Sequence, residues 1–328
     1  MRQVKTVGIA GTGVIGSAWA ARAMFHGMDV LAFDPAPGAE EAMREHIGKA
    51  WAPMAKLHGG EPANPGKLTM VATPEELGAQ VDFVQENAPE KVELKQDLLA
   101  AVDAAADEDV IIASSTSGIM PSDLQAKCQK RPERVIVGHP FNPVYLLPLV
   151  EVVPGAKQDE QVIEDATTFY TAISMYPLRV RKEVPGHISD RLQEAYWREA
   201  LHMVNDGVAT PKELDDAICY GPGLRLAIMG TCLTFHLAGG DGGIRHMLDH
   251  FGPALKWPWT KLEAPELTQG LIDRMSDGCE EQQGARSIRE LENLRDNCLV
   301  EIMQVLAKYE WAAGQVLNAP KPSMGGQS

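Results

Sequence analysis

Short runs of apolar residues recur along the first half of the chain, separated by glycine, proline and charged residues. Runs of this length, rich in valine and isoleucine, are typical of strands that a sheet buries on both faces. They predict strands at Val4–Ala10, Asp29–Phe33, Leu68–Val71, Phe83–Gln85, Val110–Ser114, Val135–Gly138, Leu149–Val153 and Leu178–Val180. Helical patterns lie between many of them, including an alanine-rich one ending near His26, Val92–Ala106 and Glu160–Ile173. This alternation predicts an α/β fold with a parallel, doubly wound sheet.

The pattern changes near residues 182–186, and almost only helical periodicity follows. The expected helices are Ile188–Asp206, Pro211–Tyr220, Leu224–Leu237, Ile244–Phe251, Glu266–Met275 and Ile288–Ala313. We therefore expect an α/β domain over residues 1–184, an all-helical domain over 185–318 and a flexible tail over 319–328.

A glycine-rich motif, Gly11-Thr12-Gly13-Val14-Ile15-Gly16, joins the first expected strand to the first helix, and Asp34 ends the second strand. In this context the motif predicts dinucleotide binding: the glycines allow a tight turn and close backbone approach, and the helix N-terminus attracts the pyrophosphate. A carboxylate after the second strand accepts hydrogen bonds from ribose hydroxyls and repels a 2′-phosphate, which favours NAD over NADP. The expected cofactor contacts here are Gly11, Gly13, Val14, Ile15, Gly16 and Asp34.

The 328 residues carry a net charge of −15, which argues against a nucleic acid or an anionic membrane as partner. No apolar run approaches the ~18 residues of a membrane span, and the five cysteines include no Cys-x-x-Cys pair. We expect a cytoplasmic protein with reduced thiols. His246 and His250 are four residues apart, but no third ligand accompanies them, so we expect a surface helix and no metal.

His139 and Glu151 lie twelve residues apart, in a run that ends in the expected strand Leu149–Val153. Oxidation of an alcohol by hydride transfer requires a base, and histidine supported by a carboxylate can serve as one. Alternatively, His139 ends a strand and Glu151 is a solvated edge charge. The run Gly138–Val153 resembles the histidine-bearing signature of the L-3-hydroxyacyl-CoA dehydrogenase family, in which these two residue types form the catalytic pair.

The resemblance extends over residues 4–315 and implies further site residues. Ser114–Gly118 resembles the family stretch whose last serine binds the substrate oxygen, so Ser117 takes that role; an ordinary helix-capping loop is the alternative. Glu86–Lys95 resembles the segment under the nicotinamide, which implies cofactor contacts from Glu90 and Lys95, although a solvated helix start would look similar. Around the histidine, the expected substrate contacts are Phe141, Asn142 and Tyr145.

The helical half departs from the family pattern in ways that bear on the substrate. Pro185–Arg191 aligns with the family's Pro-Gly-Phe-x-x-Asn-Arg, so that Asp190 replaces an asparagine that contacts the substrate; pairing with a nearby arginine is the alternative. Trp257 and Trp259 could hold a quaternary ammonium by cation–π attraction, or could serve packing or a dimer contact. With Tyr145–Pro148, these features resemble the carnitine-oxidising branch of the family more than its acyl-CoA branch.

The resemblance implies an NAD-dependent dehydrogenase of a small 3-hydroxy acid, with carnitine as the first candidate substrate, and a homodimer formed through the helical domain. A short-chain 3-hydroxyacyl-CoA dehydrogenase and an L-gulonate 3-dehydrogenase are the enzyme alternatives. A structural protein of the lens-crystallin kind is the alternative outside enzymes. Intact His139, Glu151, Ser117 and the glycine motif argue against it.

Overall fold

The computed structural model describes residues 4–319 except 228, 262–265, 267, 275–276 and 278–283. The chain forms two compact units. The first comprises the chain up to Asp190 together with Asp296–Tyr309 and the chain from Ala313, and the second comprises Arg191–Arg295 with Glu310–Ala312. The sequence led us to expect contiguous domains, whereas the first unit also contains the end of the last long helix. Residues 320–328 of the expected tail lie outside the described residues.

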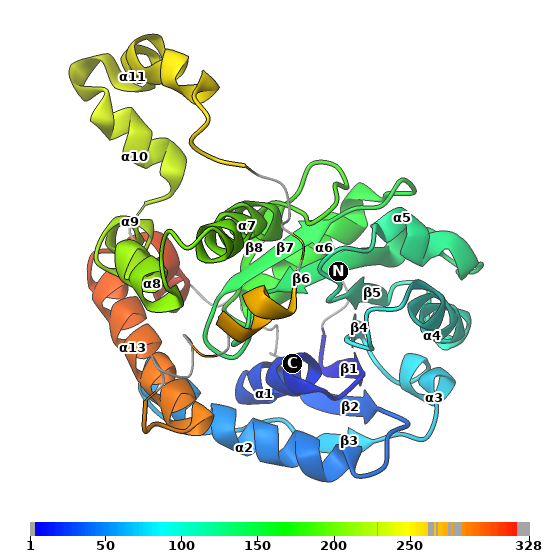
Figure 1. The fold of residues 1–328 in the computed structure, drawn as a ribbon. Helices are drawn as coiled ribbons and strands as arrows, with labels where there is room; N and C mark the ends of the chain where they lie inside the picture. The colour runs from blue at the N-terminus through cyan, green and yellow to red at the C-terminus, as the bar shows by residue number, and fades with distance from the viewer. Residues whose placement is uncertain are drawn as a thin grey trace. The chain divides into compact units, whose positions relative to one another are not determined.

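All eight expected strands are present and form one sheet of order β3-β2-β1-β4-β5-β6-β7-β8 (Figure 1). Their bounds are β1 Thr6–Ala10, β2 Asp29–Phe33, β3 Leu68–Met70, β4 Phe83–Glu86, β5 Ile111–Ser114, β6 Val135–Pro140, β7 Leu149–Val153 and β8 Tyr176–Arg179. The neighbours from β3 to β6 are all parallel. The order reverses beside β1, where the glycine motif leaves the sheet, and ligands of such sheets bind at this point.

The expectation of a wholly parallel sheet is wrong at one place, because β6 and β7 are antiparallel. The connection over residues 141–148 is too short for a parallel crossover, which needs about a dozen residues or more. The chain therefore returns directly beside β6. As a result, His139 and Glu151 are direct cross-strand partners in the register of the two strands.

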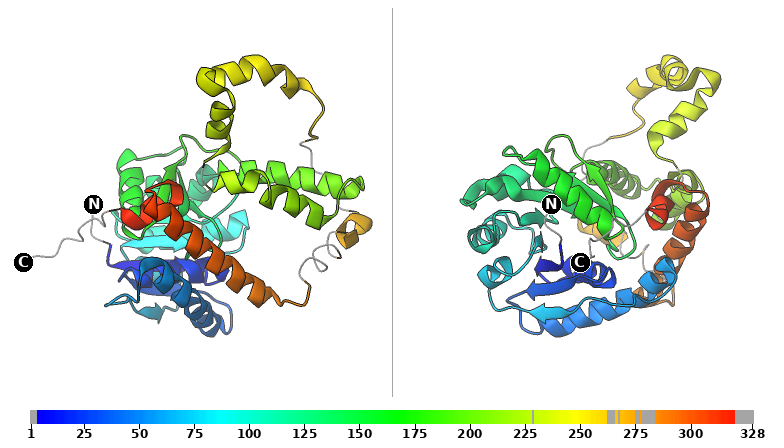
Figure 2. Two further views of the ribbon diagram at one scale, coloured as in Figure 1. Left: turned by 90° about the vertical axis from the view of Figure 1, so that its left-hand side faces the viewer. Right: turned by 180° about the vertical axis from the view of Figure 1, so that it is seen from behind.

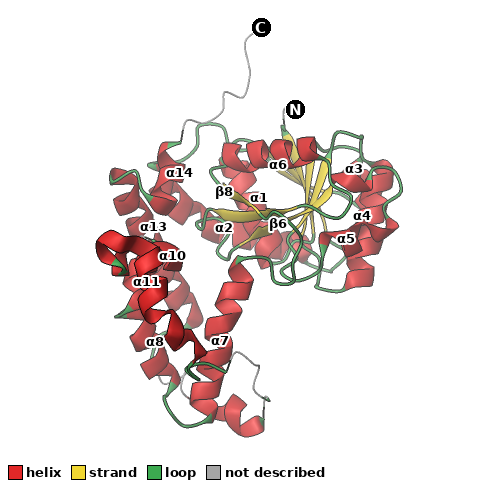
Figure 3. Ribbon diagram, turned by 90° about the horizontal axis from the view of Figure 1, so that it is seen from above, coloured by secondary structure: helices red, strands yellow, loops and turns green. Residues whose placement is uncertain are grey.

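Helices cover both faces of the sheet (Figure 3). Helices α1, α2 and α6 pack on one face, and α3, α4 and α5 pack on the other. Their bounds are α1 Val14–Phe25, α2 Ala39–His58, α3 Pro74–Gly78, α4 Val92–Ala105, α5 Pro121–Leu124 and α6 Glu160–Ala172. Short 3-10 turns are formed by Gln125–Lys127 and Pro132–Arg134.

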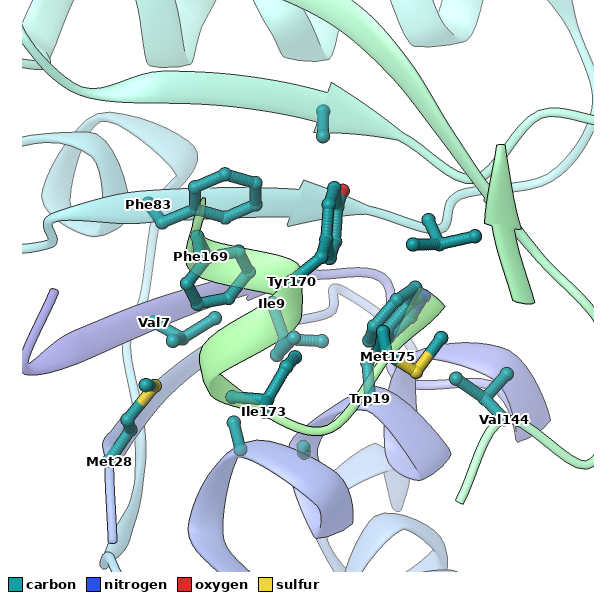
Figure 4. Close-up of a cluster of buried hydrophobic side chains, with 14 of the residues drawn as sticks. Val7, Ile9, Trp19, Met28, Phe83, Val144, Phe169, Tyr170, Ile173 and Met175 are labelled. Carbon is teal, nitrogen blue, oxygen red and sulfur yellow. The ribbon is translucent and has the colours of Figure 1, made fainter. Parts of the chain in front are cut away.

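An aromatic cluster fills the core between α6, α1 and the sheet (Figure 4). The ring of Phe169 stacks on that of Phe83, with centroids 4.0 Å apart, and Tyr170 packs against Trp19 at 5.5 Å. The Tyr170 hydroxyl is fully buried and donates to Gln85 Oε1 at 2.7 Å, so it is not left without a partner. This packing fixes α1, which begins at the glycine motif, against the centre of the sheet.

The second unit is helical, as expected, but two helix predictions are wrong in detail. Gly230 has extended backbone (φ −73°, ψ 174°) and divides the segment expected to be a single helix over 224–237 into α9 and α10. Glu310 and Ala312 are left-handed (φ 49° and 45°), so α13 ends at Lys308 rather than near residue 313. The expected helix over 266–275 lies partly outside the described residues.

The remaining helices are α7 Ser189–Asn205, α8 Pro211–Cys219, α9 Pro222–Leu226, α10 Thr231–Ala238, α11 Gly243–Phe251, α13 Ile288–Lys308 and α14 Gln315–Asn318, with 3-10 turns at Gly240–Gly242, Gly252–Lys256 and Ala312–Gly314. In the described part of the chain, no helix is both long and apolar enough to cross a membrane.

The second half of α13 lies against α2 within the first unit (Figure 2). Lys56 Nζ donates to Glu301 Oε1 at 2.8 Å on the surface. Below this pair, Leu146 of the 141–148 connection is fully buried in a cluster with Leu57, Val300, Met303 and Val316. The connection that follows His139 is thus fixed by packing from distant parts of the chain.

Candidate active site

The His139 imidazole is joined to the Glu151 carboxylate by a buried hydrogen bond, with Nδ1 2.9 Å from Oε2. The second carboxylate oxygen of Glu151 accepts the N–H groups of Ile188 and Ser189, at 2.9 and 3.0 Å. Burial opposes ionisation of Glu151, but these three hydrogen bonds outweigh it and hold the pKa of Glu151 below its usual value. The carboxylate is therefore charged at neutral pH.

The state of Glu151 determines the tautomer of His139. An ionised carboxylate only accepts hydrogen bonds, so Nδ1 carries the ring proton and Nε2 of the neutral ring has a free lone pair. The Ser117 hydroxyl lies 3.2 Å from Nε2. A substrate hydroxyl within hydrogen-bond distance of Nε2 could donate its proton to that nitrogen. General base catalysis requires this geometry.

Asp190 adds a second carboxylate at the same nitrogen, with Oδ2 3.5 Å from His139 Nε2. In neutral His139 this nitrogen is an acceptor, so two electron-rich atoms face each other. A positive charge, either on the imidazole or on a bound ligand, would reduce the repulsion between these two atoms. The asparagine that the family pattern has at this position would carry no negative charge beside Nε2.

Glu90 lies in the loop between β4 and α4, and Lys95 lies in the first turns of α4. The Glu90 side chain is about half exposed and accepts a short hydrogen bond from the Thr116 hydroxyl. Burial opposes ionisation of Glu90, but Thr116 and Lys95 outweigh it and lower its pKa. Lys95 is 1% exposed and its ammonium donates to Glu86 and to the Ala88 carbonyl. The direct cofactor contact implied for Lys95 stays a prediction.

The glycine loop is shaped for close contact with a ligand. Gly11 has φ 91°, and a Cβ atom there would lie 2.7 Å from the Asn87 backbone. A Cβ at Gly16 would lie 2.0 Å from the Gly11 carbonyl oxygen, whereas one at Gly13 would meet no atom within 4 Å. The turn is therefore closed on the protein side and open at Gly13. The first N–H groups of α1, at Val14 and Ile15, lack intrahelical acceptors and suit a pyrophosphate.

Asp34 is held at the end of β2 by the adjacent loop. Its Oδ2 accepts the backbone N–H and the hydroxyl of Thr12, at 2.8 and 3.0 Å, and its Oδ1 accepts the N–H of Ala36 at 2.9 Å. Two carboxylate oxygens offer about four acceptor positions, so one remains for a ribose hydroxyl. The loop and Asp34 together fit the adenosine diphosphate half of NAD.

The three substrate contacts predicted in the 141–148 connection have different surroundings. The Phe141 ring lies beside that of His139, with centroids 5.4 Å apart, and Asn142 is exposed. The Tyr145 hydroxyl instead donates to Asp296 of α13 at 2.6 Å. Phe141 is thus adjacent to the His139 ring, and the Tyr145 hydroxyl is directed to a helix of the first unit.

Arg22 was not predicted and fixes this same connection. Its guanidinium is fully buried and donates to the carbonyl oxygens of Val144, Ile173 and Ser174 at 2.8, 3.0 and 3.1 Å. Burial lowers its pKa to about 9. The only sequence signal is a single charge in the otherwise apolar helix Val14–Phe25.

Trp257 and Trp259 belong to the second unit, where their ring centroids are 5.2 Å apart. Both side chains are exposed, at 59% and 70%. A paired, exposed indole surface suits either a cation or a protein partner. Their expected contact with the substrate stays a prediction.

Two family models together match most of the chain. The NAD binding domain of 3-hydroxyacyl-CoA dehydrogenase matches residues 6–184, and the C-terminal domain of 3-hydroxyacyl-CoA dehydrogenase matches residues 186–285. The first match covers the glycine loop, Asp34 and the His139–Glu151 pair, and it identifies NAD as the cofactor.

Sequences and solved structures agree with these matches. L-carnitine dehydrogenase of Pseudomonas putida is 56% identical over 95% of this chain and 97% of its own, and that of Oceanobacillus iheyensis is 50% identical over 93% and 99%. A solved 5-formyl-3-hydroxy-2-methylpyridine 4-carboxylic acid 5-dehydrogenase, an NAD⁺-dependent dismutase, superposes with a TM-score of 0.79 at 27% identity, covering 92% of this chain and 98% of its own. The (S)-3-hydroxybutyryl-CoA dehydrogenase of Ralstonia eutropha gives 0.59 at 27% identity, over 75% and 85%.

Proposed function

This chain belongs to the 3-hydroxyacyl-CoA dehydrogenase family and is an NAD-dependent dehydrogenase of a 3-hydroxy substrate, and from that premise we propose that its substrate is L-carnitine. The product would be 3-dehydrocarnitine. The high identity to L-carnitine dehydrogenases over nearly the full length supports this choice.

In the proposed reaction, His139 Nε2 accepts the proton of the 3-hydroxyl group as the C3–H bond breaks. The glycine loop and Asp34 would hold NAD⁺, which would supply the acceptor for the hydride from C3. Glu151 holds the imidazole through Nδ1 and stabilises the imidazolium that forms, and Ser117 donates a hydrogen bond to the substrate oxygen. Phe141, beside the His139 ring, provides an apolar wall next to the reacting carbon.

The observation that carries the choice of carnitine is the Asp190 carboxylate beside His139 Nε2. Carnitine bears its trimethylammonium group on the carbon next to C3, so a cation comes close to the base whenever the hydroxyl does. A carboxylate at that place attracts this cation, whereas it offers no donor to a thioester carbonyl. Trp257 and Trp259 are the proposed aromatic partners of the cation.

Initial rates with L-carnitine, L-gulonate and 3-hydroxybutyryl-CoA, each with NAD⁺, test this proposal. We expect carnitine to give the highest kcat/KM, because it alone of the three carries the cation. Faster turnover of 3-hydroxybutyryl-CoA would assign the enzyme to the acyl-CoA branch and Asp190 to a structural role. Faster turnover of gulonate would exclude a cation site altogether.

We further propose a homodimer formed through the helical unit. None of the side chains of α10 is buried. Three of them are large and apolar, and Leu233, Phe235 and Leu237 are 40%, 45% and 59% exposed. Leu233 and Leu237 lie on one face of α10 and Phe235 on the opposite face, and a helix that is apolar all round is normally covered, here by a second chain. We expect sedimentation equilibrium to give twice the mass of one chain, and Leu237→Glu to shift it toward the monomer. A control, Tyr176→Glu in β8, should leave the mass unchanged; a monomeric wild type would contradict the proposal.

A cytoplasmic location is proposed on the state of the thiols. The four cysteines in the described part of the chain, Cys128, Cys219, Cys232 and Cys298, are free. Free thiols are typical of reducing compartments. Recovery of the protein in a periplasmic or extracellular fraction would contradict this location.

A further inference from the structure

His187 lies in the connection between β8 and α7, and its side chain is only 1% exposed. Its φ is 48°, in the left-handed region that only a few per cent of residues other than glycine adopt, histidine being one of the more frequent among them. Gly186 before it has φ 71°, so two consecutive residues are left-handed. A large residue held in this conformation points to a specific need for its side chain.

The His187 side chain contacts the loop after β5, where its Nε2 lies 3.1 Å from the Thr116 carbonyl oxygen. A carbonyl oxygen only accepts, so Nε2 carries the ring proton. Burial lowers the pKa of His187, so the ring is neutral and Nδ1 is unprotonated. Nδ1 is buried without a hydrogen-bond partner among the described residues. The bond to Thr116 is therefore the polar contact that a histidine supplies here and a phenylalanine could not.

The Thr116 carbonyl belongs to the peptide group that leads directly into Ser117. The Thr116 side chain is held as well, because its hydroxyl donates to Glu90 and accepts the N–H of Ile119 at 3.0 Å. With both its carbonyl and its side chain held, Thr116 restrains the backbone that leads into Ser117. The Ser117 hydroxyl, 3.2 Å from His139 Nε2, is thus directed by the contact between His187 and Thr116.

The same short segment also holds the other partner of His139. Ile188 and Ser189, which follow His187, donate their N–H groups to Glu151. The His187 ring itself packs beside His139, with centroids 5.3 Å apart. Residues 187–189 therefore connect the serine loop to the Glu151 side of the histidine.

We propose that His187 is a positioning residue that, through the Thr116 carbonyl, holds the Ser117 hydroxyl against His139 Nε2. The proposal rests on the proposed function, because it takes His139 as the base and Ser117 as the donor to the substrate oxygen. It concerns how the site is assembled and does not depend on which 3-hydroxy acid is oxidised.

A double-mutant cycle between His187 and Ser117 tests the proposal. His187→Phe removes the hydrogen-bond donor and keeps a flat ring of similar size. We expect kcat to fall about three- to tenfold, because the loss of one hydrogen bond has an effect of this size. The KM for NAD⁺ should stay unchanged. Because His187 acts through Ser117, the variant carrying both His187→Phe and Ser117→Ala should be no slower than Ser117→Ala alone. His187→Gln keeps an N–H donor and should recover most of the loss.

Three results would overturn the proposal. The first is a wild-type kcat for His187→Phe, and the second is a double variant in which the two losses of kcat multiply. The third is an equal loss of kcat in His187→Phe and His187→Gln, together with weakened NADH binding. The last would assign His187 to fold stability alone. Rates are measured with whichever 3-hydroxy compound the wild type oxidises fastest. A failure of the carnitine assignment is then seen in the wild type, and a failure of this proposal only in the variants.

Discussion

His139→Gln should lower kcat by about 10²–10⁴, the usual contribution of a positioned general base. Glutamine is polar and of similar length but cannot accept the proton that leaves the substrate hydroxyl. The residues that we expect to bind NAD⁺, in the glycine loop and at Asp34, make no hydrogen bond to His139 among the described residues. NADH affinity, measured by fluorescence titration, should therefore stay near the wild-type value.

His46→Gln is the matched control, because it makes the same chemical change in α2, outside the residues assigned to the site. We expect its kcat to equal that of the wild type. A His139→Gln enzyme that kept most of its kcat would show that the proton goes to another group. In that case the short contact between His139 and Glu151 would be structural.

The sequence was sufficient to predict the pairing of His139 with Glu151, but not the way in which the fold achieves it. Both residues fall in or beside expected strands, and the family resemblance implied their contact. The direction of β7 was predicted wrongly, because apolar runs identify strands without giving their orientation. The brevity of the 141–148 connection was the available signal, since a hairpin connection can be this short and a crossover cannot.

Arg22 and His187 could not have been assigned from periodicity. Arg22 bonds to carbonyls more than a hundred residues away, and His187 bonds to one 71 residues before it. Such contacts depend on the order of strands in the sheet, which brings the loop after β5, the 141–148 connection and the start of α7 together at one end. The sequence showed these two residues only as exceptions to a local pattern. Arg22 is a charge in an apolar helix, and His187 stands where the resembling motif has phenylalanine.

Replacing the substrate's ammonium nitrogen by carbon should lower kcat/KM by about ten- to a thousandfold, although the shape of the molecule hardly changes. The test compound is 3-hydroxy-5,5-dimethylhexanoate, the neutral isostere of carnitine. Each cation–π contact contributes ~0.5–2 kcal/mol, a partly desolvated attraction to Asp190 adds a similar amount, and 1.4 kcal/mol corresponds to tenfold. Equal kcat/KM for the two compounds would exclude a cation site.

Asp190→Asn separates the two effects that a carboxylate beside His139 could have. If Asp190 attracts the substrate cation, the substitution should lower kcat/KM for carnitine and leave the neutral isostere almost unaffected, so that the gap between them narrows. If Asp190 acts only on the imidazole, both compounds should lose equally, because both transfer their proton to the same nitrogen. Asp97→Asn, an exposed acid of α4 paired with Lys127, is the matched control and should change neither rate. An equal loss for both compounds would contradict the proposed substrate selection while leaving the role of His139 as base intact.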